Sequence, residues 1–484
     1  MDPILLLLPV LLPPVCGLGL LLSSAEDAKR NRLVMTFTVL NSLLTAGLLL
    51  SVREGSTVVY SFTGAFSIAL GADGLSRLFA GMLAVMWPLV TLYAFSYMEQ
   101  EKRRKQFFAF FLMTYGVTLG AAFSANLTTL YVFFEMLTLV TLPLVTHKED
   151  SDSLFAGRRY LNYCLTGAAM GLAATVAATL AGAGDFRYGG SITGADASEL
   201  MRVFFLLGFF GFGVKTAIFP LFLWLPTASV APTPVTALLH AVAVVNTGIF
   251  SVARLTWYAF GPTSLSGTWV QTVCLTASAF SLLFGAVMAL RQRHLKRRLA
   301  YSTMSNLSYM LFGISLMTTA GFEGALAHML FHSVMKMTLF LCAGAWIHRT
   351  GNEYIYEAEG IGRKMPVTFG CFTLCALSLS GIPPLCGFVS KWQLLQAGME
   401  AGTTAAWIGG GCLLTAAFLC AIYSLSICIR AFFPGNGRIP AGAEIREADG
   451  RMLAPIIFFS LLSLLFGVFQ TPVMQAISAV AAGM

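Results

Sequence analysis

The sequence predicts an all-α polytopic membrane protein, and three features of its composition lead to this fold class. Apolar residues fill 57% of the 484 positions and charged residues only 11%, whereas about 25% of an average soluble chain is charged. The mean hydropathy is +0.77 over the whole length, which excludes a soluble enzyme tethered by one or two spans. The 46 glycines, 39 phenylalanines and 21 methionines suit packed transmembrane helices.

Hydropathy predicts about 14 transmembrane helices within one polytopic domain, residues 1–484. Each span needs about 20 predominantly apolar residues. The first apolar run, which begins MDPILLLLPV, carries an acidic residue where a cleavable signal would be positive, so we interpret it as a span. The predicted ranges are 4–22, 33–51, 76–97, 107–123, 127–146, 159–182, 202–228, 233–257, 269–290, 299–318, 324–348, 366–396, 405–430 and 452–478.

The distribution of basic residues predicts the orientation. With the amino terminus outside, 22 of the 30 lysines and arginines fall in cytoplasmic loops, including 102–105, and five, including Arg254, fall in outer loops. Cytoplasmic loops carry such an excess, so we expect both termini outside the cell membrane. Asp73 and the basic run 294–298 are interpreted as a helix-entry residue and a cytoplasmic anchor. Topology thus explains the net charge of +8, and nucleic acid is not an expected partner.

No cofactor or metal site is predicted. The ten cysteines stand singly in apolar segments, which is typical of small packing residues. The chain has no phosphate-binding loop, no GxGxxG after a strand, and no soluble segment long enough for a flavin or an iron–sulfur cluster.

Glu135 and Lys215 are the first candidate functional residues. A charge at mid-bilayer costs about 2.5–3.5 kcal/mol on insertion scales, so it needs a partner or a water-lined path. Glu135 lies in LYVFFEMLTLV, with apolar residues on both sides, and Lys215 lies near the middle of its span, five residues before Pro220. A proline breaks a helix where neighbouring groups or cavity water can satisfy the freed carbonyls. We therefore expect an ion site at Lys215.

Lys391 repeats this pattern, because it follows the doublet Pro383–Pro384 in LSGIPPLCGFVSK. Broken helices at corresponding positions of two halves are typical of the transport site of inverted-repeat carriers. A lone lysine can also snorkel to the membrane surface, and Lys391 lies nearer a helix end than Lys215 does.

Three further candidates, His328, His332 and Lys336, are spaced by four residues and so share one helix face. A proton relay, hydrogen bonding between helices and a zinc site are the alternatives for this stripe, and zinc is disfavoured because no carboxylate or cysteine stands at ligand spacing. His240, about two turns into its helix, is a candidate relay residue or a neutral packing residue.

These segments resemble the antiporter-like subunits shared by respiratory complex I, Mrp-type cation/proton antiporters and membrane-bound hydrogenases. The motifs that carry the resemblance are FFE at Glu135, GVKTAIFPLFLWLP at Lys215, APTPVTALLHA at His240, LKRRLAYSTMSNLSYM at 295–310, HMLFHSVMKMTLFLCAG at 328–344 and GIPPLCGFVSK at Lys391. The chain length, the FFE context and a lysine at position 391 are most similar to the D-type Mrp subunit.

The resemblance implies two inverted five-helix repeats, residues 107–257 and 269–430, each with one broken helix. It also implies a Glu–Lys pair that toggles a buried charge, followed by a polar axis, and the matching positions are Glu135, Lys215, His240, Lys336 and Lys391. His328 and His332 are additional relay candidates.

The function that follows is a proton-translocating subunit that works with other membrane subunits and makes or breaks no bond itself. Sodium is a further candidate ion, and the complex could be an antiporter, a hydrogenase or an NADH:quinone oxidoreductase. Two alternatives stay open: a stand-alone carrier for sodium or an organic solute, and a redox subunit that binds quinone. A stand-alone carrier would need the end of a half-helix that coordinates an anion. The second lacks any cofactor signature.

Overall fold

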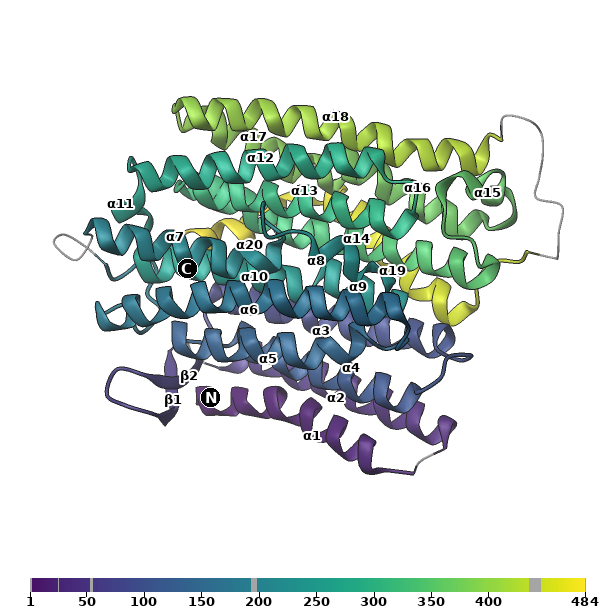
Figure 1. Cartoon of the computed structure of the whole chain (residues 1–484), viewed down its shortest axis with the longest axis horizontal. Coiled ribbons are helices and arrows are strands. Elements are labelled where there is room, and N and C mark those ends of the chain that lie inside the picture. Colours follow the sequence, from purple (N-terminus) through teal and green to yellow (C-terminus); the bar gives the residue numbers. More distant parts are fainter. Residues whose placement is uncertain (1, 25, 53–54, 193–197, 435–444, 484) are drawn as a thin grey trace.

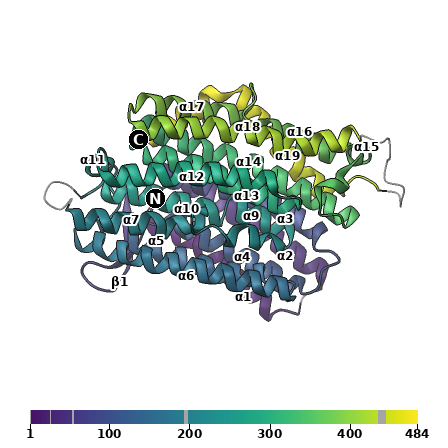
Figure 2. The same cartoon turned by 45° about the horizontal axis from the view of Figure 1, so that its top comes forward.

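The computed structural model describes residues 2–24, 26–52, 55–192, 198–434 and 445–483. Two arginines of the charge count, Arg53 and Arg438, lie outside these ranges. Most helices run side by side along the longest axis of the molecule, and both termini lie toward the end that carries a small β-hairpin (Figure 1). The same bundle, turned, shows α12, α13 and α14 stacked through its middle (Figure 2).

Side-chain caps begin several helices in the first part of the chain, including α3, α5 and α6. Asp73, Asn126 and Asp150 accept hydrogen bonds from amides three residues on, at 2.9, 2.8 and 2.7 Å, which satisfies donors that a helix start leaves free. The elements are η1 (Pro3–Leu6), α1 (Leu7–Leu22), α2 (Asp27–Ser51), β1 (Ser56–Ser61), β2 (Ser67–Gly71), α3 (Gly74–Tyr97), α4 (Arg104–Ala122), α5 (Leu127–Val145), α6 (Ser151–Leu180), α7 (Glu199–Gly213), η3 (Val214–Thr216), α8 (Trp224–Thr227) and η4 (Ala228–Val230).

The second part contains the longest helix, α14, in the described chain. Its elements are α9 (Thr233–Ala241), α10 (Val244–Ala253), the π-helical η5 (Arg254–Phe260), α11 (Pro262–Leu265), α12 (Trp269–Arg291), α13 (Leu295–Ser315), α14 (Thr319–Thr350), η6 (Ile355–Ala358), α15 (Ile361–Lys364), α16 (Pro366–Ser380), α17 (Cys386–Glu400), α18 (Thr404–Phe432), α19 (Gly450–Val468) and α20 (Gln470–Ala481). Helical structure overlaps every segment predicted from hydropathy, with ends that differ by up to eight residues.

The β-hairpin corrects the prediction that every element is helical. Strands β1 and β2 pair antiparallel, with Ser56 opposite Gly71. The hairpin is attached to the α4–α5 loop, where the Ala125 amide donates 3.0 Å to the Ala69 carbonyl and the Asn126 side chain donates 3.1 Å to the Ser67 carbonyl. The run STVVYS is rich in β-branched residues, but a search for apolar stretches of about 20 residues passes over strands of this length.

Two predicted spans are interrupted as expected at their prolines. Helical structure stops after Thr216 and resumes at Trp224, with Pro220 between, and it stops after Ser380 and resumes at Cys386, with Pro383 and Pro384 between. The segment with His240 is also interrupted, at Val242–Ala243 between α9 and α10, and this break was not predicted.

Ten helical segments within the described residues are long and apolar enough to cross a membrane. The predicted count of 14 also includes the interrupted and less apolar segments, and it stays a prediction. Burial separates the centre of the bundle from its edge. In an apolar stretch of 18 residues, all residues are buried in Thr233–Phe260 and 89% in Thr319–Thr350, but only 33% in Pro3–Leu22. The segments that carry His240 and Lys336 therefore form the centre.

Candidate functional site

Lys215 is completely buried, and its side chain reaches the helix that carries Glu135. The Lys215 ammonium donates a hydrogen bond to the Phe134 carbonyl of α5 and lies 3.8 Å from the centre of the Phe134 ring. Glu135 and Lys215 interact electrostatically, but no ion pair within 4.0 Å joins them in the described structure. Glu135 Oε1 is buried without a hydrogen-bond partner there. The two residues are thus neighbours, whereas their direct pairing stays a prediction.

The backbone around Lys215 is held by contacts with several elements. The Trp224 indole donates a hydrogen bond of 2.7 Å to the Val214 carbonyl. The Phe219 amide donates one of 3.0 Å to the hydroxyl of Ser281 in α12. Gly248 lets α10 approach, since a Cβ there would lie 2.9 Å from the Lys215 Cβ. The helix break is therefore a fixed structure that presents one long, flexible side chain.

His240 lies in α9 at the centre of the bundle. Its completely buried ring stacks on Phe340 of α14, with ring centres 4.9 Å apart. Neither ring nitrogen has a hydrogen-bond partner in the described part of the chain. The ring interacts electrostatically with Lys336 and Lys296. Buried polar groups are normally paired, and the choice between a relay residue and a packing residue stays a prediction for His240.

The predicted stripe on α14 is completely buried. Lys336 Nζ donates 3.0 Å to the Leu299 carbonyl of α13. Neither nitrogen of His332 has a partner among the described residues, and its ring centre lies 5.9 Å from that of His328. His332 interacts electrostatically with Lys336, His328, Lys391 and His240, so it links the two ends of the stripe.

His328 differs from its neighbour because both of its nitrogens are occupied. Nδ1 lies 2.9 Å from Ser390 Oγ of α17, and Nε2 lies 3.2 Å from Asn306 Oδ1 of α13. This is the hydrogen bonding between helices that was the alternative to a relay. Within the described residues no group of three or more His, Cys, Asp or Glu side chains could hold a metal ion.

Lys391 lies in the first half of α17 and is 5% exposed. Its Nζ donates 2.5 Å to the Leu379 carbonyl and lies 5.0 Å from the centre of the Tyr309 ring. The residue four positions after Leu379 is Pro383, which has no N–H to donate, so the helix itself cannot satisfy this carbonyl. The proline break thus creates the acceptor that Lys391 uses.

The three lysines found in apolar runs, Lys215, Lys336 and Lys391, all bind main-chain carbonyls and no carboxylate. A carbonyl oxygen accepts a hydrogen bond from an ammonium and also from a neutral amine, because both forms carry N–H groups. The contact therefore survives when the lysine loses its proton. A carboxylate would instead favour the charged form strongly.

Four basic residues that were interpreted as loop or anchor features are buried, namely Arg30, Arg254, Lys296 and Arg298, so they are not exposed loop residues. Arg254 is 1% exposed because its helix continues through the π-helical turn to Phe260, and its guanidinium pairs with the carboxylate of Asp73. Lys296 is 3% exposed because α13 already begins at Leu295, and its Nζ donates 3.2 Å to the Ala231 carbonyl. Asp73 does cap α3, as expected for a helix-entry residue.

A pocket connects Lys296 to the loops predicted to be cytoplasmic. It has a volume of about 140 Å³, and its lining includes Lys148, Asp150, His294, Lys296 and Glu353. His294 Nε2 lies 2.9 Å from Glu353 Oε2, and this hydrogen bond is the main reason that the pKa of Glu353 is lowered to about 2. The lining thus brings several titratable groups together with a buried lysine.

Comparison with known sequences identifies the relatives of this chain. The transmembrane family described as NADH:quinone oxidoreductase/Mrp antiporter matches residues 124–416. NADH-quinone oxidoreductase subunit N from Desulforudis audaxviator is 31% identical over 435 residues, which are 85% of this chain and 84% of that protein. A Na(+)/H(+) antiporter subunit A1 from Staphylococcus haemolyticus is 29% identical over 463 residues. This chain spans little more than half of that longer subunit, 56%.

Solved structures share the fold. Respiratory complex I from Thermus thermophilus contains a chain that matches with a TM-score of 0.83 and 26% identity, over 98% of both chains. The Mrp complex from Dietzia sp. contains one that matches with a TM-score of 0.85 and 23% identity, over 99% of this chain and 52% of the other.

Proposed function

This chain belongs to the NADH:quinone oxidoreductase/Mrp antiporter family of membrane subunits, and from that premise we propose that it is a proton-translocating subunit of a multi-subunit ion pump or antiporter. Its partners are other membrane subunits of the same complex in the cell membrane. The sodium named for the antiporter relative makes sodium a further candidate ion. The chain itself carries out no bond chemistry.

The observation that carries this proposal is the series of buried bases through the bundle. Three lysines on backbone carbonyls and the unpaired rings of His240 and His332 are all buried in the bundle, and each of these groups can bind a proton. Charged groups inside a membrane protein mark ion paths and proton relays.

In the proposed cycle, Glu135 controls Lys215. When the carboxylate approaches, its charge stabilises the Lys215 ammonium, and when it withdraws, burial favours release of the proton. The hydrogen bond from Lys215 to the Phe134 carbonyl supports a withdrawn arrangement as one state of this cycle. A carboxylate with one unpaired buried oxygen gains a partner by moving toward the lysine.

The released proton passes to His240 and then along α14 to Lys336, His332 and Lys391. Lys296 supplies a second entrance from the pocket at His294, because it lies one helical turn before Leu299, whose carbonyl binds Lys336.

We further propose that the chain crosses the membrane 14 times, with inverted repeats at 107–257 and 269–430 and both termini outside the cell. The two proline breaks, each followed or preceded by a buried lysine, support the repeats. The loop at 102–105 would then be cytoplasmic. Labelling of an Arg103→Cys variant in intact cells tests this orientation, and ready labelling from outside would overturn it.

The test of the function is reconstitution in liposomes with and without the subunits that copurify with the chain. Proton transport is expected only from the assembled complex. Robust sodium/proton exchange by the chain alone would contradict the proposal and favour the stand-alone carrier. The copurifying subunits also identify the complex: iron–sulfur proteins indicate a respiratory or hydrogenase complex, and small membrane subunits alone indicate an Mrp antiporter.

A further inference from the structure

A second polar region lies away from the lysine axis, where the ends of α2, α3, α4 and α19 meet. These ends enclose a pocket of about 570 Å³. Three of the helices, α2, α3 and α19, are candidate membrane spans. The pocket therefore lies at the level where a membrane surface would meet the bundle.

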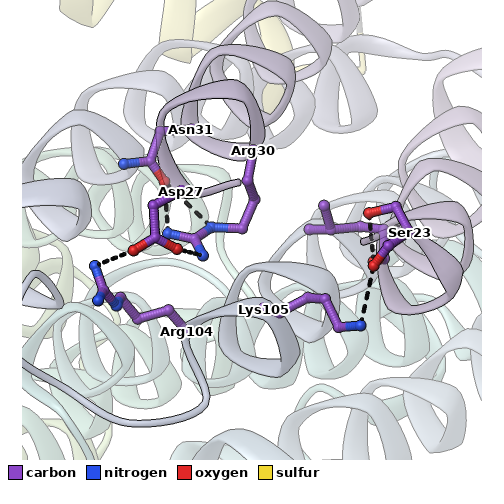
Figure 3. Close-up of polar contacts among 7 residues, drawn as sticks. Ser23, Asp27, Arg30, Asn31, Arg104 and Lys105 are labelled. Carbon is purple, nitrogen blue, oxygen red and sulfur yellow. Dashed lines mark hydrogen bonds and ion pairs between the residues drawn. The ribbon is translucent and has the colours of Figure 1, made fainter. Parts of the chain in front are cut away.

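One wall of the pocket is a fixed cluster of charges (Figure 3). Asp27 pairs with Arg30 and, at 2.8 Å, with Arg104. The Arg30 guanidinium also donates 3.1 Å to Asn31 Oδ1 and lies 5.6 Å from the centre of the Phe108 ring. Two guanidinium groups thus share one carboxylate. These contacts hold Arg30 in place, and its side chain is only 4% exposed.

Further positive charge lines the opening. Arg32 and Arg451 are exposed, border the pocket and have no hydrogen bond or ion pair within the described residues. Glu99 is the other acidic residue of the lining. The lining therefore carries four guanidinium groups and two carboxylates, an excess of positive charge that attracts anions.

The pocket changes from polar to apolar along each helix that forms it. On α2 the lining residues Asp27, Asn31 and Met35 follow one another by four positions and share a face. On α3 the exposed Glu99, just beyond the helix, is followed inward by Phe95 and Leu92. On α4, Arg104 at the helix start precedes the buried Phe108 by one turn. The ligand that fits this gradient has an anionic head and an apolar tail.

We propose that this pocket binds an anionic phospholipid, with the phosphate at Arg32, Arg104 and Arg451 and the start of an acyl chain along Met35 and Leu92. Basic pockets between transmembrane helices bind such headgroups. A free phosphate ion shares the charge chemistry but would leave the apolar half of the pocket unused.

The test uses the full chain with its copurifying subunits in mild detergent. Spin-labelled phosphatidylglycerol and phosphatidylcholine are titrated separately, and the preference for the anionic lipid is measured by electron paramagnetic resonance. Arg32→Gln and Arg451→Gln should each lower this preference about fivefold, the effect of one arginine near a membrane surface. Arg158→Gln, an exposed arginine on α6 outside the pocket, is the matched control and should leave the preference unchanged.

Competition with inorganic phosphate and with glycerol 1-phosphate distinguishes the sources of the phosphate group. Lipid binding that persists in excess of both supports a phospholipid site. Displacement by either at concentrations comparable to the lipid would show a soluble-phosphate site and overturn the lipid assignment. Equal lipid preference in wild type and in both pocket variants would overturn the site altogether.

Discussion

Replacing Glu135 with glutamine should slow proton transport without unfolding the protein. The change keeps the size of the side chain and removes the charge that would draw Lys215 into its protonated form. Breaking a buried ion pair can cost about 3–5 kcal/mol of stability. That loss is not expected here, because the described structure contains no ion pair between these two residues within 4.0 Å and Glu135 is only partly buried.

The size of the effect follows from the two arrangements of the pair. Opposite unit charges interact by about 4 kcal/mol at 4 Å and by about 2 kcal/mol at 8 Å for an effective dielectric constant of 20. An approach of that size changes the proton affinity of Lys215 by about 2 kcal/mol, or about 30-fold. We expect Glu135→Gln to lower the transport rate by about this factor. Glu135→Asp should recover part of it, and Lys215→Arg should be inactive because a guanidinium does not release its proton.

The assay is proton uptake by proteoliposomes that contain the assembled complex, followed with a pH-sensitive dye. Glu199→Gln is the control for loss of a carboxylate, since Glu199 is an exposed residue at the start of α7. Subunit composition must be shown to be intact in each variant. Assembled Glu135→Gln or Lys215→Arg complexes that pump at the wild-type rate would refute the switch.

Three further predictions concern the end of the axis and two charged contacts outside it. Lys391→Glu should keep more transport than Lys391→Ala, because a carboxyl group can hold and release a proton and a methyl group cannot; equal loss at normal membrane levels would argue against a relay. Asp73→Asn keeps the helix cap but leaves the buried Arg254 guanidinium, 1% exposed, without a counter-charge. Thermal unfolding should therefore show a loss of up to about 3 kcal/mol, and unchanged stability would argue against a stabilising ion pair between these residues. Glu353 has a pKa lowered from 4.5 to about 2 mainly by its hydrogen bond with His294, so its stabilising effect should be present above pH 4.5 and lost as the pH falls through 2. Because Glu353 is partly exposed, Glu353→Gln should cost less than about 1 kcal/mol of stability near neutral pH. A larger cost in pH-dependent unfolding would count against this assignment.

The positions of the helices along the sequence were predictable because hydropathy and proline are strong signals. Apolar runs locate the helices, and Pro220 and Pro383 lie where two of them stop. The break at Val242–Ala243 was missed because neither residue is a helix breaker, and the hairpin was missed because its strands are short. Both features depend on contacts with distant segments, such as the hydrogen bond from Asn246 to Ser333 Oγ of α14, 2.7 Å.

The burial of the candidate site residues was predictable, but their contacts were not. An apolar surrounding identified Lys215, Lys336 and Lys391 as buried charges. The same reasoning failed for Lys296 and Arg254, because a basic residue at the end of an apolar run has the same local pattern whether it faces water or the protein interior. Which oxygen each lysine binds depends on tertiary packing, which one helix alone does not contain.

The carbonyl acceptors of the three lysines have a consequence for genetics. Codon changes replace side chains, so no point mutation can delete the oxygen of Phe134, Leu299 or Leu379. A library of substitutions would score these three positions by the bulk of their apolar side chains and would pass over the atoms that hold the charges. Only chemical editing of the main chain, such as replacing the following amide by an ester to weaken the carbonyl as an acceptor, would expose their contribution one at a time.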